Sequence, residues 1–291
     1  MQDLIDKAAT LLEALPYIQR FRGETFVVKY GGSFMDSSDP AVRTGVARDI
    51  VFLEAVGINP VVVHGGGKAI SRAMKEEGLE PRFVEGHRVT DEASVQLVDR
   101  VLSNELNPEI VATVKALGGG AVGLPGREIL RCRRKEFTNA AGEPYSLGFV
   151  GEVLSVDPVR IREAMDEAVT PIISPTARSE SGQLYNCNAD LVAAEVAIAL
   201  KARRLVFMSD VPGVMEDPKD PSSLISELAV GDVSSLKSRE VIGAGMIPKI
   251  DSAVEAIQAG VHKVSLVDGR VNHALLLEIF TDKGVGTQVI P

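Results

Sequence analysis

Short apolar stretches alternate along the chain with longer stretches in which apolar residues recur every three or four positions. The short stretches are rich in Val and Ile, which favours strands buried on both faces of a sheet. The longer stretches have the period of amphipathic helices. The expected strands cover residues 25–30, 60–64, 170–174, 204–209 and 263–268. The expected helices cover residues 41–56, 67–77, 91–117, 158–168, 189–202, 246–259 and 271–279. This alternation predicts an α/β fold with an open, mostly parallel sheet sandwiched between helices.

Two regions depart from the alternation. Residues 118–155 contain short β-rich stretches and the turn sequence NAAGEP, which together predict a β-hairpin insertion. Residues 174–188 are mostly polar, so we expect a loop there and a boundary between two lobes. The predicted organisation is an N-terminal helix over residues 1–22, an N-lobe over residues 23–176 and a C-lobe over residues 177–291.

The N-terminal helix is amphipathic, with apolar residues at helical spacing on one face. These residues are Leu4, Ile5, Ala8, Leu11, Leu12, Leu15 and Ile18. Pro16 is expected to kink the helix, because proline removes a backbone hydrogen bond and its ring clashes with the preceding turn. Two interpretations stay open. The apolar face packs on its own domain, or the helix is an oligomerisation arm.

Composition narrows the functional class. The formal net charge of −9 argues against a nucleic-acid-binding protein. One basic stretch, residues 131–137, is expected to be a solvated strand or hairpin face. Cys132 and Cys187 have no CxxC spacing and indicate reduced thiols. No signal peptide and no apolar run of membrane-spanning length is present, so we expect a cytoplasmic protein.

Two glycine clusters directly follow expected strands. Lys29 precedes Gly31 and Gly32 after the first strand, and the residues 65–67 are all glycine after the second. In parallel sheets ligands bind beyond the carboxyl ends of the strands, and the second cluster also opens a helix whose free N–H groups attract anions. Neither cluster is a P-loop, and the GxGxxG at residues 118–123 follows a helix instead of a strand. The two glycine clusters and Lys29 together predict an anion site suited to a phosphoryl group.

Polar residues at two further helix starts extend this site. Asn186, Asn188 and Asp190 exceed what one helix cap requires. Lys249 lies in the first turn of a helix, where a cation opposes the helix dipole, so a bound phosphate explains it better than chance does. His64, at the end of the second strand, is interpreted as a core histidine.

Seven motifs in order resemble the amino acid kinase family over nearly the whole chain. They are VVKYGGS (27–33), VVVHGGGKAI (61–70), GHRVTD (86–91), NCNAD (186–190), SDVPGV (209–214), GMIPKIDSA (245–253) and DGRVNHALLLEIFTDKGVGTQVI (268–290). Within the family, the chain is similar to the branch that phosphorylates the γ-carboxylate of N-acetyl-L-glutamate in arginine biosynthesis. The N-terminal helix and the closing segment resemble the arginine-inhibited, hexameric members of that branch.

The resemblance implies a role for each motif residue. Lys29 and Lys249 would contact the phosphates of ATP, which carries Mg²⁺, and Asp190 would hold both lysines. The substrate-binding residues would be Gly32, Gly66, Gly67, Arg88, Asn186 and Asn188, with Arg88 on the α-carboxylate of acetylglutamate and the asparagines at its acetamido end. The residues lining the nucleotide pocket would be Ser209, Asp210, Val211, Pro212, Gly213, Val214, Val241, Ile242 and Gly243.

Two positions depart from the family pattern. Ala244 replaces the first of two glycines before MIPK, and Ser265 stands where arginine-sensitive members are expected to have a histidine. Tyr17, Glu278 and Gly284 still fit an arginine site. The alternatives are a kinase for glutamate, aspartate, carbamate or UMP, and a non-catalytic nucleotide or arginine sensor. The resemblance implies a homohexamer built as a trimer of dimers through the N-terminal helices, and it leaves binding of a PII-type regulator open.

Overall fold

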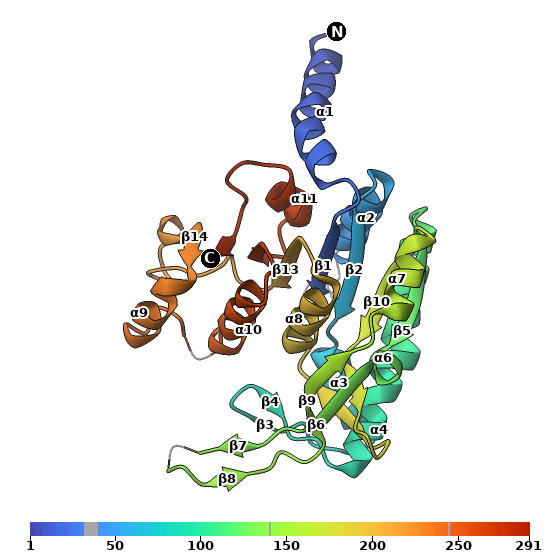
Figure 1. Ribbon diagram of the computed structural model, residues 1–291, viewed down its shortest axis with the longest axis vertical. Helices are drawn as coiled ribbons and strands as arrows, with labels where there is room; N and C mark the ends of the chain where they lie inside the picture. The colour runs from blue at the N-terminus through green and yellow to red at the C-terminus, as the bar shows by residue number, and fades with distance from the viewer. Residues whose placement is uncertain (32–39, 140, 244) are drawn as a thin grey trace.

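An eight-stranded sheet forms the centre of the protein in the computed structural model, which describes residues 1–31, 40–139, 141–243 and 245–291 (Figure 1). The strand order is β14-β16-β15-β13-β1-β2-β10-β5. The strands are β14 (Glu227–Ala229), β16 (Thr287–Ile290), β15 (Lys263–Asp268), β13 (Arg204–Ser209), β1 (Thr25–Tyr30), β2 (Asn59–His64), β10 (Thr170–Ser174) and β5 (Ala121–Pro125). Neighbours pair in parallel except β15 and β16. The predicted open, mostly parallel sheet is confirmed.

Alternate strand residues supply two hydrophobic cores, one on each face of the sheet. Val27 of β1 packs with the helices of one face, and its neighbour Val28 packs with those of the other. This follows from the strand period of two. The first face carries α7 (Val159–Asp166), α8 (Ala189–Leu200) and α10 (Ile247–Gln258). The second face carries α2 (Pro40–Ala55), α5 (Asn107–Ala116) and α11 (Ala274–Ile279).

The helix expected over residues 91–117 has a π-helical centre. It consists of α4 (Glu92–Asp99), the π-helical turn η2 (Arg100–Leu106) and α5. Pro108 has no N–H to continue the α-helical pattern, and the Asn107 N–H bonds to the Leu102 carbonyl five residues back. α3 (Gly67–Glu76) packs against α4 and η2.

A closed four-stranded barrel lies beside the sheet. Its strands are β11 (Thr176–Arg178), β12 (Leu184–Cys187), β9 (Val150–Val156) and β6 (Leu130–Arg134). The predicted hairpin insertion is present as the antiparallel β6–β9 pair, but β5 from the same stretch belongs to the main sheet. The prediction of a loop over residues 174–188 is wrong, because β11 and β12 form an antiparallel hairpin there. Barrel closure buries Leu184 and Cys187 among polar neighbours, which masks the strands in the sequence.

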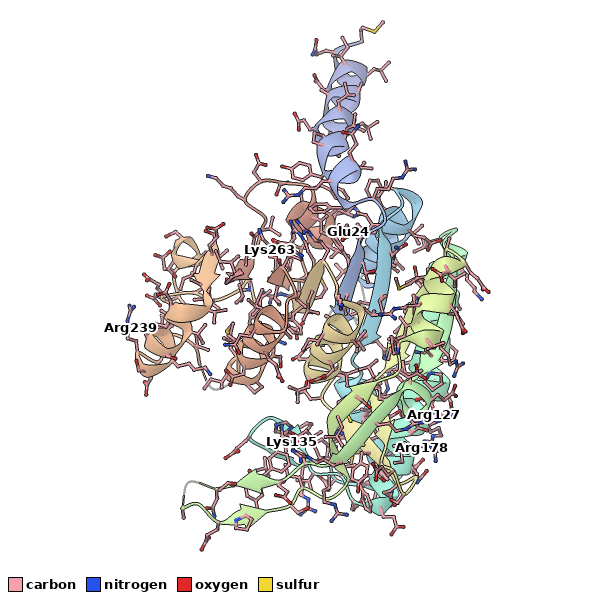
Figure 2. The ribbon with its side chains drawn as sticks, viewed as in Figure 1. Glu24, Arg127, Lys135, Arg178, Arg239 and Lys263 are labelled. Atoms are coloured by element: carbon pink, nitrogen blue, oxygen red, sulfur yellow. The ribbon has the colours of Figure 1, made fainter. Side chains whose placement is uncertain are left out.

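Smaller elements surround the barrel and the sheet. They are β3 (Phe83–Val84), β4 (His87–Arg88), α6 (Gly126–Ile129), β7 (Phe137–Thr138), β8 (Pro144–Tyr145), η3 (Pro221–Ser223), η4 (Val230–Asp232) and α9 (Val233–Ser238). The basic stretch spans β6 and the start of β7, with Lys135 near the β7–β8 hairpin (Figure 2). Arg133 is exposed and pairs with Glu152, whereas Cys132 points inward. The expected solvated face is confirmed, and both cysteines are buried free thiols.

Helix α1 (Gln2–Phe21) projects away from the rest of the molecule (Figure 1). Leu4, Ile5, Leu11, Leu12 and Leu15 are exposed, between 42% at Leu15 and 69% at Leu11, and Ile18 near the end is half-buried. The interpretation that this face packs on its own domain is therefore wrong for most of the helix. Only the end of the helix is anchored, where Phe21 packs against Phe26 and Tyr17 against Phe280. No helix in the described ranges combines the length and apolarity required to cross a membrane.

Candidate active site

Three charged side chains from three elements meet at the carboxyl end of the sheet. Lys29 lies near the end of β1, Asp190 in the first turn of α8 and Lys249 in the first turn of α10. Asp190 Oδ1 is 3.1 Å from Lys29 Nζ, and Oδ2 is 2.6 Å from Lys249 Nζ. The three side chains are nearly buried, with 12–16% of their surface exposed. The structure therefore brings together the three residues predicted to be catalytic.

The electrostatics of this cluster keep its carboxylate ionised. Burial raises the pKa of Asp190, but the charges and hydrogen bonds of Lys29 and Lys249 outweigh burial and lower the pKa to about 2. Burial lowers the pKa of Lys249, and the Asp190 charge opposes that shift. The Lys249 ammonium also lies 5.3 Å from the centre of the Phe207 ring. Each lysine uses only part of its three donors on Asp190, which leaves donors for an anion.

Gly31, two residues after Lys29, leaves room for the lysine side chain at the end of β1. A Cβ at Gly31 would lie 2.9 Å from Lys29 Nζ and 3.3 Å from the Gly65 nitrogen. A side chain here would push the lysine away and separate the two glycine loops. The Gly65 N–H donates to the Tyr30 carbonyl at 2.7 Å, which joins the ends of β1 and β2. Gly32, predicted to bind substrate, lies outside the described residues.

A cavity of about 260 Å³ opens beside the charged cluster. Gly66 caps α3 and Gly67 begins it, so both backbone N–H groups stand at the positive end of a helix. The predicted residues that line this cavity are Lys29, Gly66, Gly67, Arg88, Asn186, Asn188 and Asp190. Residues from separate motifs, up to 161 positions apart, therefore border one space.

Arg88 is a buried cation that lines this cavity, and its partners among the described residues are neutral. Its guanidinium donates to the Gly67 carbonyl at 2.8 Å and to Ser71 Oγ at 2.9 Å, and it stacks 4.6 Å from the centre of the Phe83 ring. A sulfur contact to Met74 at 3.2 Å completes its surroundings. Burial lowers the pKa of Arg88 below its usual value. These neutral partners fix the side chain without neutralising it, which suits it to an anionic ligand.

The two asparagines have different surroundings. Asn188 is the N-cap of α8, and its Oδ1 accepts from the Asp190 N–H at 2.7 Å, so capping accounts for that oxygen. Asn186 donates to Thr90 Oγ1 at 3.3 Å, and Thr90 donates to the Arg88 carbonyl at 3.0 Å. The fully buried Thr90 thus links two cavity residues. Sequence reasoning missed Thr90, although it lies within GHRVTD.

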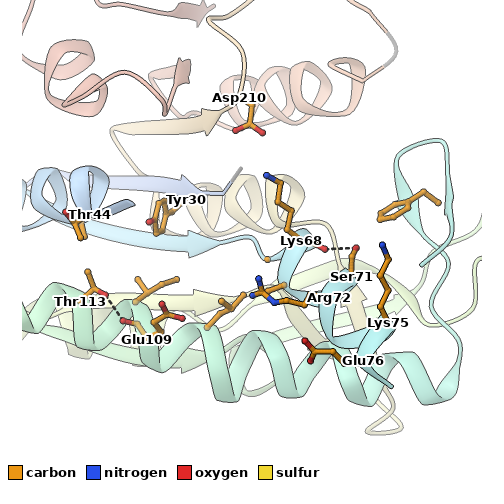
Figure 3. Close-up of a pocket in the computed structure, with 17 residues that line it drawn as sticks. Tyr30, Thr44, Lys68, Ser71, Arg72, Lys75, Glu76, Glu109, Thr113 and Asp210 are labelled. Atoms are coloured by element: carbon orange, nitrogen blue, oxygen red, sulfur yellow. Dashed lines mark hydrogen bonds between the residues drawn. The ribbon is translucent and has the colours of Figure 1, made fainter. Parts of the chain in front are cut away.

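The predicted nucleotide residues are only partly brought to the cleft. Asp210, at the end of β13, borders a second cavity of about 960 Å³ with Lys68 of α3 (Figure 3). This cavity shares Gly66 and Gly67 with the first. The two cavities therefore meet at residues 65–67, which we call the glycine loop. The side chains of Val214 and Ile242 are buried in the core and do not line either cavity.

The remaining predicted nucleotide residues lie near these segments. Ser209 is the last residue of β13, its hydroxyl bonds to the Val211 carbonyl, and Val211 is exposed. A Cβ at Gly213 would lie 2.4 Å from Thr287 Oγ1, so Pro212 and Gly213 form a close-packed turn before Val214. Val241 packs on the core and Gly243 is exposed. Ala244 lies outside the described residues.

The three residues assigned to an arginine site lie together at the base of α1. The Tyr17 hydroxyl bonds to Asp282, in the same segment as Gly284. Gly284 has φ +67°, and a Cβ there would lie 2.3 Å from Glu278 Oε2. Ser265 donates to Glu278 Oε1 at 2.8 Å. The departure at Ser265 therefore falls within this same cluster.

The fold and this site define a class of protein. The sequence pattern of the amino acid kinase family matches residues 24–268, and the chain belongs to this family. It is 46% identical over the full length of both chains to the acetylglutamate kinase of Heliobacterium modesticaldum. It is 47% identical to the acetylglutamate kinase of Akkermansia muciniphila, over 99% of this chain and 96% of that one.

A solved structure shares the fold at lower identity. The N-acetylglutamate synthase of Neisseria gonorrhoeae in complex with coenzyme A and N-acetyl-glutamate has a TM-score of 0.83 and 26% identity, over 98% of this chain. The chain spans 63% of that synthase. The same synthase in complex with coenzyme A and L-arginine has a TM-score of 0.78 over 97% of this chain and 65% of that one.

Proposed function

We propose that this protein is an N-acetyl-L-glutamate kinase that transfers the γ-phosphoryl group of ATP to the γ-carboxylate of its substrate. The product is N-acetyl-L-glutamyl 5-phosphate, an intermediate of arginine biosynthesis. The observation that carries the proposal is the 260 Å³ cavity lined by Lys29, Asp190, the glycine loop and Arg88, with Lys249 paired to Asp190 beside it. It offers separate cationic groups to a phosphoryl group and to a second anion. Full-length relatives named acetylglutamate kinase support the choice of acceptor.

The reaction requires positioning and charge stabilisation more than proton transfer. A γ-carboxylate with a pKa of about 4.3 is ionised at neutral pH and needs no general base. One of its oxygens attacks the γ-phosphorus, the bond from that phosphorus to the bridging oxygen breaks, and ADP leaves with the bonding electrons. Lys29 and Lys249 offset the negative charge on the phosphates, and Asp190 holds both ammonium groups in place.

The remaining cavity residues position the acceptor. Arg88 pairs with the α-carboxylate, because its guanidinium is buried with only neutral partners. Asn186 and the free amide group of Asn188 hold the acetamido end. The Gly66 and Gly67 N–H groups receive phosphoryl and carboxylate oxygens. Replacing Arg88 by Ala is expected mainly to raise the KM for acetylglutamate.

The two halves of the sheet divide the substrates. The N-lobe supplies β1, β2, β5 and β10, and the C-lobe supplies β13, β14, β15 and β16. In this proposal the N-lobe binds acetylglutamate, with help from the asparagines just after the boundary. The C-lobe binds ATP through residues 209–214 and 241–243, and Mg²⁺ arrives on the nucleotide as part of the substrate. We also propose that the protein is cytoplasmic, because buried free thiols and ATP are both typical of that compartment.

Measurement of ADP formation tests the proposed acceptor. The full-length protein is assayed with Mg²⁺-ATP and, in parallel, N-acetyl-L-glutamate, glutamate, aspartate, carbamate or UMP. Acetylglutamate is expected to give a kcat/KM at least about 100-fold above the others. Carbamate and UMP lack the α-carboxylate that Arg88 pairs with, and glutamate and aspartate carry a charged ammonium in place of the acetamido group that the asparagines hold. A higher value for any other acceptor would assign the protein to a different kinase. ATP binding without phosphoryl transfer to any acceptor would support a sensor.

We further propose that arginine binds at the base of α1 and inhibits the enzyme. Tyr17, Glu278 and Gly284 lie together there, and the structurally similar synthase was solved with L-arginine. Arginine is expected to reduce ADP formation by the wild-type protein, and Tyr17→Ala is expected to weaken that inhibition. Full activity at saturating arginine would exclude this effector.

The exposed apolar face of α1 supports a hexamer assembled as a trimer of dimers. Deletion of residues 1–20 is expected to convert the hexamer to dimers in size-exclusion chromatography. A hexamer that survives the deletion would show that the contacts lie elsewhere. Adding a purified PII-type protein to the same column tests this possible partner: co-elution with the hexamer would support binding, and separate elution would exclude it.

A further inference from the structure

His64 lies under the glycine loop, in direct contact with its backbone. It is the last residue of β2, is fully buried and immediately precedes Gly65. Its Nδ1 is 2.8 Å from the Gly65 carbonyl oxygen, and its Nε2 is 3.3 Å from Asn107 Nδ2. A carbonyl oxygen can only accept, so Nδ1 carries the proton. Nε2 then accepts from the Asn107 amide group.

Asn107 is itself fixed in one orientation. Its Nδ2 donates to the Ile172 carbonyl of β10 at 2.8 Å, which identifies the end of the amide that faces His64. On the other side, a Cβ at Gly123 of β5 would lie 2.2 Å from Asn107 Oδ1, so glycine leaves the room that this oxygen occupies. The side chain thus contacts the end of β2 and the middle of β10 and β5, and its donor points at Nε2.

The contact with His64 determines the direction of the next amide. The Gly65 carbonyl and the Gly66 N–H belong to one peptide unit, which is trans, so the two groups point in opposite directions. Since the carbonyl points into the core at His64, the Gly66 N–H points outward to the cavity that Gly66 lines.

The neighbouring backbone groups restrict this peptide on both sides. The Gly65 N–H is bonded to Tyr30, and the Gly66 carbonyl accepts from the Ile70 N–H at 2.9 Å. A Cβ at Gly66 would lie 2.5 Å from Leu102 and 2.6 Å from Leu106, so the π-helical turn packs directly against it. Within the described part of the chain, no acceptor is recorded for the Gly66 N–H.

We propose that His64 is a positioning residue: its neutral Nδ1–H form, selected by Asn107, holds the Gly65–Gly66 peptide so that the Gly66 N–H points at the transferred phosphoryl group. The inference rests on the proposed kinase function and assigns His64 and Asn107 a part in it. Burial lowers the pKa of His64 to about 4, although its bond to Gly65 opposes the shift, so the ring is neutral in the physiological range. An imidazolium would have no acceptor for Asn107.

Paired substitutions separate the two ring nitrogens. In His64→Asn the side-chain amide can take the place of Nδ1 and donate to Gly65, whereas in His64→Gln the amide reaches the place of Nε2. We expect H64N to retain kcat within about threefold and H64Q to lower it about 10- to 100-fold, since a misdirected donor weakens transition-state stabilisation. The KM for acetylglutamate is expected to change less than kcat. The exposed His262, changed to Asn and to Gln, is the matched control and is expected to leave kcat unchanged.

A second measurement does not depend on activity. Nitrogen NMR of the full chain labelled with ¹⁵N-histidine reports which ring nitrogen carries the proton, with the His64 signal assigned by its loss in H64N. A neutral Nδ1–H ring from pH 5 to 8 is expected. An Nε2–H form, an imidazolium at pH 7, or equal loss of kcat in H64N and H64Q would overturn the inference. If the wild-type protein does not phosphorylate acetylglutamate, the proposed function fails, while the NMR result still decides the tautomer.

Discussion

Asp190 and Glu278 are two carboxylates shielded from solvent, and they are stabilised in different ways. Asp190 contacts two lysine ammonium groups at the edge of the 260 Å³ cavity. Glu278 is fully buried at the base of α1 and accepts four hydrogen bonds from neutral donors. The donors are Ser265 Oγ, Gln288 Nε2 and the backbone N–H groups of Val285 and Gly286.

The difference separates a site that can bind a ligand from one that is internally satisfied. The lysines on Asp190 keep donors for a second anion, and that anion can bind without breaking the cluster. The four donors on Glu278 leave its oxygens little capacity for another partner. Arginine would have to replace one of these bonds, which is a structural reason to expect moderate rather than tight inhibition. Under the proposed function, the same residue chemistry therefore serves catalysis at Asp190 and structure at Glu278.

The largest effect is expected from removing the charge of Asp190. Asp190→Asn preserves shape but leaves two nearly buried lysines without a counter-charge. Breaking a buried ion pair in this way costs about 3–5 kcal/mol. Urea unfolding of wild type and D190N at pH 7 measures the difference. Asp251→Asn is the control, because Asp251 pairs with Lys237 at an exposed site and its loss is expected to cost less than about 1 kcal/mol.

Acid titration of the same two proteins sharpens this result. The folded-state pKa of Asp190 is about 2, below its usual value of 3.8, so the folded state holds this proton less tightly than the unfolded state. The stabilisation is present above about pH 4 and is lost as the pH falls towards 2. Wild type is expected to lose about 2 kcal/mol more than D190N across that window. Equal losses would mean that Asp190 is not held by the lysines.

Removing either lysine is expected to affect catalysis more than folding. Lys29→Ala and Lys249→Ala should each lower kcat about 100-fold, equivalent to about 3 kcal/mol, because each ammonium stabilises charge on the transferred group. ADP formation with acetylglutamate measures the effect, and circular dichroism checks the fold. Lys263→Ala is the matched truncation near Glu278 and is expected to leave kcat within about twofold. Near-wild-type turnover of K29A or K249A would exclude that lysine from the phosphoryl site.

A change at Glu278 is expected to have the opposite signature. In Glu278→Gln the new amide group meets donors whichever way it turns, since both oxygens already accept two bonds. We expect a stability loss of about 1–3 kcal/mol with kcat unchanged in the absence of arginine. Thermal and urea unfolding measure the loss, with Glu255→Gln on the exposed face of α10 as the control. A tenfold fall in kcat for E278Q would contradict the separation of the two sites.

Local patterns accounted for most of the fold. Each strand of the main sheet near the site is a continuous apolar run, and each covering helix has its own period, so both were predictable from adjacent residues. The barrel was not, because β11 and β12 are only three and four residues long, β6 and β9 carry exposed polar residues, and these strands pair with partners distant in sequence. The sequence therefore predicts a loop over residues 174–188. The π-helical turn also went unpredicted, because the helical period continues through it.

The site divides in the same way. The type and position of Lys29 and Lys249 suggested an anion site without any knowledge of contacts. Residue type and position do not identify Thr90 and Asn107. Thr90 acts through Asn186, 96 positions away, and Asn107 through His64, 43 positions away. His64 was correctly predicted to be a core residue, but its contact with Gly65 depends on the fold.

The smallest expected effect is the loss of folding stability when one hydrogen bond to Glu278 is removed. Ser265 is fully buried on β15 and supplies one of the four donors to Glu278. Ser265→Ala should cost about 1 kcal/mol, since Glu278 Oε1 keeps its bond from Gln288 and no charge is exposed. In an E278Q background the same change should cost less than half as much, because the bond it removes is already disturbed; urea unfolding of the two single variants and the double variant measures this coupling. If the two costs are instead simply additive, Ser265 stabilises the protein through packing, and the neutral donors are not what compensates the burial of Glu278.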